Sequence, residues 1–330
     1  MATPTRADEP AQDPDSAPAD LGYFGPGSMS WRVFLHPATQ VMIAQVTNLI
    51  ESPHIVFQHV LIDHDPMFGA RSRTRHRGDG PRVTFYDRVV RTVSVPAPLL
   101  FGSTAEADKA ARRLFNYHRP MHGTLSDTRQ PYAATDPSSM LFAAVTIAHA
   151  AWLAYENFGF ARGRRVPPLT EDEVRQYLTE ASRFGALMGA PKDQFPTSRD
   201  ELDRYYESVS GEFRTTTGWT LDRLRAVGRL FRPGDGRRPR HMATDTLVLI
   251  SELMCFAVIP AEFRRLNGVP KALDPAFRLM YLWATPAFWA LGTSSRLTDR
   301  VHQIYRRDDP EITRLLDGAL ALERRRTAAG

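Results

Sequence analysis

Histidines are the residues of this chain whose chemistry is most open to use, and they are unevenly placed. The sequence holds ten, and all except His241 and His302 fall in its first half. A neutral imidazole binds metal ions and exchanges protons near neutral pH. His149 differs from the rest because it lies in an uncharged run over residues 137–155, where apolar surroundings would keep the ring neutral. It is therefore the first candidate ligand, for iron in particular.

His149 admits two interpretations. A histidine on an apolar helix is commonly a core residue with a satisfied hydrogen bond, and spacing alone favours that interpretation. The neighbours Ala148, Ala150 and Ala151 point the other way, because small side chains leave room for a large flat group to approach the helix. The residues by themselves leave open whether His149 is structural or a ligand.

A second metal site is conceivable around His118 and His122. Their i,i+4 spacing would place both rings on one face of a helix, and Asp136 could add a carboxylate. Pro120 lies between them, however, and proline disfavours the helical conformation of the residue before it. The spacing therefore favours a turn at a helix end over a two-histidine metal site.

Three further histidines, His54, His59 and His64, recur at five-residue spacing. Five residues rotate a helix by about 140°, so the three rings cannot share one face. Surface and capping roles are expected for them.

Composition excludes several classes of protein. The single cysteine, Cys255, allows no internal disulfide and no cysteine-based zinc or iron–sulfur site. There is no G-x-S-x-G, P-loop or G-x-G-x-x-G motif. The net charge of +5 is spread along the chain, and the basic clusters at 71–77 and 237–241 lack interleaved aromatic residues. No nucleic-acid partner is expected.

The ends and the apolar runs bear on location. Residues 1–21 are rich in Pro, Asp and Ala without an apolar signal-peptide core, which predicts a disordered tail and favours a cytoplasmic protein. The run over residues 138–155 is long enough to cross a membrane. Its polar residues, such as Thr146 and His149, favour a buried core helix instead, and no stable membrane span is expected.

The elements that would position these histidines are helices. Three capping boxes, in which Ser or Thr precedes Glu by three residues, predict helices over residues 104–118, 171–188 and 199–214. The boxes are Ser103–Glu106, Thr170–Glu173 and Ser198–Glu201.

Apolar periodicity predicts nine more helices, and a short strand is possible over Arg82–Tyr86. We expect one all-α domain over residues 22–310, with a C-terminal helix and tail over 311–330. The nine helices are predicted over 38–50, 53–63, 84–93, 138–158, 218–230, 243–257, 274–291, 297–306 and 310–325.

A longer pattern then connects these parts. GPGSMSWRV (25–33) is followed by DRVVRT (87–92), LFGST (100–104), KAARRLFNYH (109–118) and YAATDP (132–137), and then by the helix that carries His149. In order and spacing this resembles the family of latex-clearing proteins (rubber oxygenases) and MpaB-type oxygenases. The similarity extends from about residue 22 to about residue 300.

The resemblance implies a single globin-like, multi-helix domain that holds haem b. His149 occupies the position of the axial iron ligand, and Arg113 matches the arginine on the distal side of the haem. His118 and Arg91 are expected to meet the haem propionates. Two further assignments follow from position alone: Asn116 and Tyr117 stand where distal polar groups occur, and Glu106 is the candidate acidic base.

Function follows from the same resemblance. We expect a haem-dependent oxygenase that uses O₂ on an apolar, isoprenoid-like small molecule, with Arg113 stabilising the negative charge that develops in the reaction. The alternative is a haem-free helical protein that binds a lipid or terpenoid and in which His149 is a core residue. The sequence predicts no oligomeric state.

Overall fold

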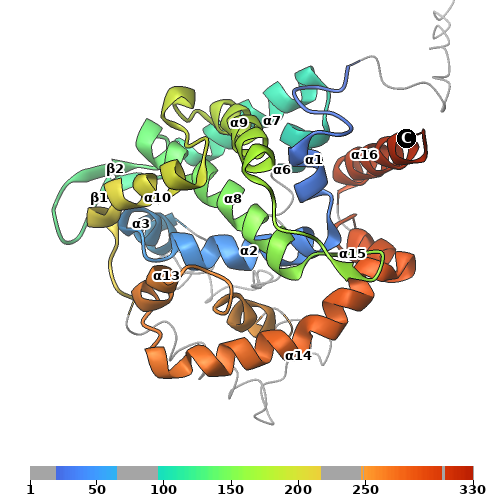
Figure 1. Ribbon diagram of the computed structural model, residues 1–330. Coiled ribbons are helices and arrows are strands. Elements are labelled where there is room, and N and C mark those ends of the chain that lie inside the picture. Colours follow the sequence, from blue (N-terminus) through green and yellow to red (C-terminus); the bar gives the residue numbers. More distant parts are fainter. Residues whose placement is uncertain (1–19, 65–95, 217–246, 248, 307–308, 330) are drawn as a thin grey trace, which may run out of the picture.

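The fold is organised around one long helix. The computed structural model describes residues 20–64, 96–216, 247, 249–306 and 309–329. Helix α8, Pro137–Phe158, crosses the middle of the molecule, with α2 (Pro37–Glu51) and α9 (Glu171–Met188) beside it (Figure 1). It begins with a proline in its first turn, where a missing N–H costs nothing. Because helices surround it, its uncharged sequence is buried on nearly all sides.

Three neighbours take three faces of α8. Thr146 faces α2, since its hydroxyl lies 2.7 Å from the carboxylate oxygen of Glu51. The carbonyl of Ala148 faces α9 and accepts a hydrogen bond from Tyr177. His149 lies one residue, or about 100° of rotation, further round the helix and faces α10 (Arg199–Ser208). The rotation of the helix therefore separates His149 from the residues next to it in sequence.

Local capping set two of the predicted helices to the residue. Helix α7 spans Thr104–His118 and α9 spans Glu171–Met188, and each begins with a complete capping box. At α10 the box is half formed, because Glu201 turns its carboxylate to the backbone and hydroxyl of Thr197. That helix ends at Ser208 rather than at the predicted residue 214. A single turn of 3₁₀ helix, Ser210–Glu212, follows it.

Most of the other predicted helices are present, and most of their ends lie within about two residues of the predicted ends. The short helices α1, α6 and α13 and two small hairpins were not predicted, because segments of six residues or fewer carry too little periodicity. Predictions over residues 82–93 and 218–230, and the basic clusters at 71–77 and 237–241, lie outside the described residues. The remaining bounds are α1 Met29–Phe34, α3 Ile55–His64, α6 Pro96–Phe101, α13 Ala261–Leu266, α14 Asp274–Thr293, α15 Ser295–Arg306 and α16 Pro310–Ala329, and residues 249–255 are also helical.

Two antiparallel hairpins connect the helices. Strands β1 (His122–Thr124) and β2 (Pro131–Ala133) follow α7, where Pro120 prevents its continuation. Strands β3 (Phe160–Ala161) and β4 (Arg164–Arg165) follow α8 and pack on α14. Both are two-stranded, so neither forms a separate layer.

The described residues confirm the all-helical class. A globin-like arrangement remains a prediction. One described helix, α8, is long and apolar enough to cross a membrane, but 78% of its apolar window is buried inside the molecule. It is a core helix, as the sequence predicted.

Candidate functional site

His149 is a buried residue at the interface between α8 and α10. Its side chain is 8% exposed, and its Nδ1 is 2.9 Å from the hydroxyl oxygen of Tyr206. Its Nε2 has no hydrogen-bond partner among the described residues. In the tautomer whose Nδ1–H donates to Tyr206, Nε2 carries the lone pair that a metal needs.

The surroundings keep this ring neutral. Burial, and secondarily the positive charge of Arg199, lower the pKa of His149 to about 4. Burial also raises the pKa of Tyr206 well above its usual value, so the hydroxyl keeps its proton. At neutral pH the pair is therefore an uncharged imidazole held by an uncharged phenol.

Trp152 lies one turn after His149 on the same face of α8. The two ring centres are 5.9 Å apart, and the guanidinium of Arg199 lies 4.3 Å from the centre of the indole. The indole N–H of Trp152 is buried and has no partner among the described residues. Two neighbouring rings on this face of α8 thus each carry a nitrogen without a partner among the described residues.

Helix α10 supplies the partners of this face. Arg199, Leu202 and Tyr206 recur at three- and four-residue spacing, which places them on one side of the helix. Arg199 is fixed at its position, because it donates to Glu171 and to the carbonyl of Leu169, both at 2.9 Å. It is thus a positioned cation above Trp152 rather than a mobile surface side chain.

The alanines around His149 serve a different purpose from the one expected. Ala148, Ala150 and Ala151 are buried, and they point away from the histidine because successive helical residues are 100° apart. Small residues on α8 allow close helix packing; Ala144, for example, approaches Gly185 of α9 so closely that a Cβ there would be 3.1 Å away. The interpretation of these alanines as clearance for a flat group was wrong.

The residues predicted on α7 lie elsewhere. Arg113 is exposed, while Nδ1 of His118 bonds the carbonyl of Leu114 in its own helix at 3.0 Å. Burial lowers the pKa of His118. The cation next to His149 is Arg199, which the sequence did not single out.

The other residues that were expected to act at the haem site, most of them on α7, make structural contacts or face solvent where they are described. Glu106 completes the capping box with Ser103 and pairs with Arg314 of α16. Burial opposes its ionisation, but these partners outweigh it and lower the pKa of Glu106. Asn116 and Tyr117 are exposed, and Arg91 lies outside the described residues.

The alternative metal site does not assemble. His122 is exposed in β1, and Asp136 accepts a hydrogen bond from the backbone of Ala133. Within the described part of the chain, no three His, Cys, Asp or Glu side chains come together as a metal-binding group. The five-residue series also disperses, since His54 bonds Glu212 at 3.0 Å whereas His59 bonds Ser126 at 3.1 Å.

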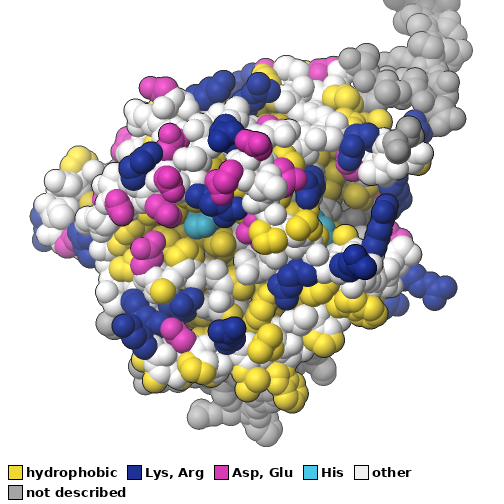
Figure 2. All heavy atoms as spheres, viewed as in Figure 1, with side chains coloured by type: hydrophobic (Ala, Val, Ile, Leu, Met, Phe, Trp, Pro, Cys, Tyr) yellow, Lys and Arg dark blue, Asp and Glu magenta, His cyan; other side chains and the backbone are white. Residues whose placement is uncertain are grey.

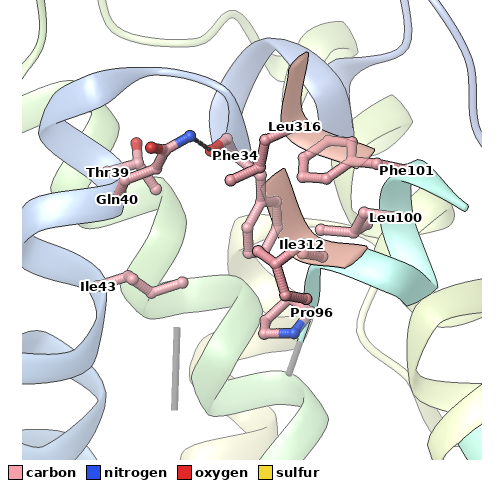
Figure 3. Close-up of a pocket in the computed structure, with 10 residues that line it drawn as sticks. Phe34, Thr39, Gln40, Ile43, Pro96, Leu100, Phe101, Ile312 and Leu316 are labelled. Carbon is pink, nitrogen blue, oxygen red and sulfur yellow. Dashed lines mark hydrogen bonds between the residues drawn. The ribbon is translucent and has the colours of Figure 1, made fainter. Parts of the chain in front are cut away.

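A small apolar cavity lies away from His149, between α2, α6 and α16 (Figure 3). Its volume of about 30 Å³ suits a water molecule rather than a substrate. Its polar lining residues are Thr39, whose buried hydroxyl has no partner among the described residues, and Gln40. The other lining residues include Phe34, Ile43, Leu100, Phe101, Ile312 and Leu316.

Fold and site together define an all-helical protein with a buried, neutral imidazole between α8 and α10, of which one nitrogen has a hydrogen-bond partner. The chain belongs to the family described as "ER-bound oxygenase mpaB/B'/Rubber oxygenase, catalytic domain", which it matches over residues 31–307. It is therefore an oxidoreductase of the oxygenase class, from a family that uses a haem-type iron cofactor. Searches of curated proteins and of solved structures found no match.

Sequence reasoning missed Arg199 and Tyr206. Their spacing on a predicted helix was visible, but nothing in the sequence shows that this helix packs on α8 at the level of His149. The pairing is a product of the tertiary fold.

Proposed function

We propose that this protein is a haem b-dependent oxygenase in which His149 is the axial iron ligand. The observation that carries the proposal is a buried, neutral imidazole whose Nδ1 is held by Tyr206 and whose Nε2 has no partner among the described residues. This donor chemistry fits a haem iron, because an axial histidine bonds the metal through one nitrogen and a neighbouring group through the other. The bound haem would supply the oxygen chemistry.

The surrounding residues have distinct roles in this proposal. Tyr206 fixes the orientation of the His149 ring and, by accepting from Nδ1–H, makes Nε2 the more basic nitrogen. Arg199 favours the neutral form of His149 and holds the indole of Trp152 in place. Most of the residues of α8 around the imidazole are apolar and buried, and α10 adds Leu202 and Tyr206.

Roles on the other side of the haem come from the family resemblance. Arg113 is the proposed cation that stabilises negative charge developing on the oxygen side, and His118 and Arg91 are the proposed propionate partners. The exposure of Arg113 on α7 means that it could act only where a bound group or the substrate reaches that surface.

The proposed substrate is an apolar, isoprenoid-like alkene, and O₂ is the co-substrate. The family supports a small-molecule substrate, and the core around His149 offers aromatic and aliphatic walls for an apolar one. A cytoplasmic location is part of the same proposal.

Absorption spectroscopy tests the proposal directly. The purified full chain, reconstituted with haemin, should show a Soret band that shifts on reduction with dithionite. His149→Ala should lose that band, while the thermal unfolding curve confirms that the variant is folded. His59→Ala, which alters a histidine of α3 that bonds Ser126 and has no role in the proposed haem site, is the matched control and should keep the Soret band.

The haem-free alternative makes the opposite prediction. A colourless protein that cannot be reconstituted, from which a lipid or terpenoid is extracted, would identify a binding protein in which Tyr206 satisfies a structural His149.

A further inference from the structure

Helix α14 presents an apolar face to solvent. Four large side chains on it are exposed to an unusual degree: Leu279 and Leu282 at 55%, Trp283 at 80% and Trp289 at 48%. Pro275, Ala276, Pro286 and Ala287 are also exposed and extend the same face. The helix has 20 residues and is therefore about 30 Å long. A continuous exposed apolar patch of this kind marks a site of contact with another surface.

The opposite face of α14 fastens it to the core. Phe277, Phe288 and Leu291 are buried, and Phe288 packs against Phe158 at the end of α8 with ring centres 4.7 Å apart. Gly292 lies so close to the backbone of Phe160 that any Cβ there would clash. The exposed face is thus a property of a firmly packed helix.

Basic side chains surround this face. Hairpin β3–β4 packs on the second half of α14, because the indole N–H of Trp289 donates to the carbonyl of Gly163 at 3.1 Å. The hairpin carries exposed Arg162 and Arg164, and α14 itself carries exposed Arg278. Lys271 and Arg296, at the two ends of the helix, are also exposed.

Acidic side chains are absent from both segments. Residues 157–170 and 275–298 contain no Asp or Glu. Asp274, at the start of α14, is paired with Arg264 at 3.5 Å and with Arg265. Figure 2 shows the same division: acidic side chains gather over α9 and α10, whereas hydrophobic and basic side chains cover the lower part of the view, where α14 lies.

We propose that α14 and hairpin β3–β4 form a membrane-docking face that binds the surface of an anionic lipid bilayer. The leucines and tryptophans would enter the boundary between headgroups and acyl chains, where indole rings are favoured. The surrounding arginines and Lys271 would contact lipid phosphates, and their positive charge selects an anionic bilayer over a neutral one. The helix would lie in the plane of the membrane without crossing it. A second copy of this chain is the competing occupant, but two such faces would bring their basic rims together.

Vesicle sedimentation with the full chain tests this proposal. Wild-type protein should bind vesicles that contain roughly one-third phosphatidylglycerol, and it should bind vesicles of pure phosphatidylcholine much more weakly. Trp283→Glu should lower the partition coefficient at least about tenfold, since it places a charge in the apolar contact. Arg278→Gln should lower the partition coefficient by about fivefold, and added salt should also lower it.

Two controls decide the result. Ile62→Glu, on α3, changes an apolar side chain outside this face that is 51% exposed, close to the 55% of Leu279, and should leave the partition coefficient unchanged. Leu279→Glu repeats the test if Trp283→Glu unfolds, as judged by circular dichroism.

Two outcomes would overturn the proposal. One is the absence of binding to anionic vesicles, and the other is equal binding by wild type, Trp283→Glu and Arg278→Gln. A wild-type dimer that either face variant turns into a monomer, without vesicle binding, would assign the face to a second copy. The proposal is independent of haem, whose content these variants should not alter.

Discussion

His36, which is partly buried, and His149, which is buried, differ in how many of their ring nitrogens have hydrogen-bond partners. Burial lowers the pKa of each to about 4, so both rings are neutral at physiological pH. His36 uses both nitrogens: Nδ1 accepts from the backbone N–H of Ala38, and Nε2 is 3.2 Å from the carbonyl of Phe160, to which it donates. His149 uses one nitrogen, on the side chain of Tyr206. The difference teaches that a neutral histidine is available to a ligand when its second nitrogen has no backbone partner.

The largest expected effect is the loss of haem binding when the side chain of His149 is removed, whereas removal of the His36 side chain should leave haem bound. His149→Gly should abolish the Soret band, and added imidazole should restore it, because the small molecule can fill the space of the lost ring. His36→Gly should retain haem with or without imidazole. Titration with haemin, followed by absorption, measures both variants. If His36→Gly loses haem and His149→Gly keeps it, the comparison is reversed.

Tyr206 gives the next largest effect, because it holds the nitrogen of His149 that faces away from the proposed ligand. Tyr206→Phe should weaken haem binding by about tenfold or more and shift the iron reduction potential, as removal of a partner from an axial histidine does. Tyr205→Phe is the matched control, since Tyr205 is adjacent and its hydroxyl does not contact His149. Equal haem affinity and potential in the two variants would show that Tyr206 is only a packing residue.

Acid should destabilise the protein through both rings. A histidine whose pKa is about 4 when folded and 6.5 when unfolded contributes stability that is present above pH 6.5 and is lost as pH falls toward 4. The His36 contribution to this loss between pH 7 and pH 5 should be about 1–2 kcal/mol. Urea unfolding at the two pH values measures it. In His36→Gln the pH dependence should be smaller; an identical slope in wild type and variant would contradict the assignment.

A smaller effect is expected from the capping role of His36. Its Nδ1 accepts from Ala38 at the start of α2, so His36→Ala should cost about 0.5–2 kcal/mol of the free energy of unfolding. His36→Asn, which restores a capping acceptor, should recover most of that loss. Thermal or urea unfolding compares the two variants, and equal losses in both would exclude capping as the cause.

The two arginines should give the smallest and most distinct effects. Arg199→Gln removes the cation over Trp152 and the ion pairs with Glu171 and Glu156, so it should lower stability by about 1 kcal/mol and perturb the Soret band. Arg113→Gln should leave stability unchanged, because the side chain is exposed. It should lower oxygen uptake with a polyisoprenoid if Arg113 has the proposed role, and unchanged uptake would remove Arg113 from the site.

Much of the secondary structure was predictable from local chemistry. Capping boxes at Ser103 and Thr170 defined α7 and α9, because both the side-chain and backbone partners of a box lie within four residues. At Ser198 the same motif gave the correct start, although Glu201 bonds Thr197 instead of completing the box. The end at Ser208 was not predicted, because a capping box carries no information about where a helix ends. Short helices and hairpins escaped prediction because their stability comes from packing rather than from sequence pattern.

The candidate site was predictable only in part, for a related reason. The position of His149 in an uncharged helix predicted a buried and neutral ring, which the structure confirms. Its partners could not be predicted, because Tyr206 is 57 residues away in the sequence. The meaning of the alanines was also misjudged, since a one-dimensional neighbour on a helix is not a neighbour in space.

The sequence by itself determined the helical class, the burial of α8 and the family, because each depends on composition, periodicity or local motif. Only the tertiary structure decided that Tyr206 and Arg199 are the partners of His149 and that Arg113 faces solvent. It alone also showed that the apolar sequence of α14 has one buried and one exposed face. The physical reason is that periodicity tells which residues share a side of a helix, whereas packing between distant segments decides what that side meets.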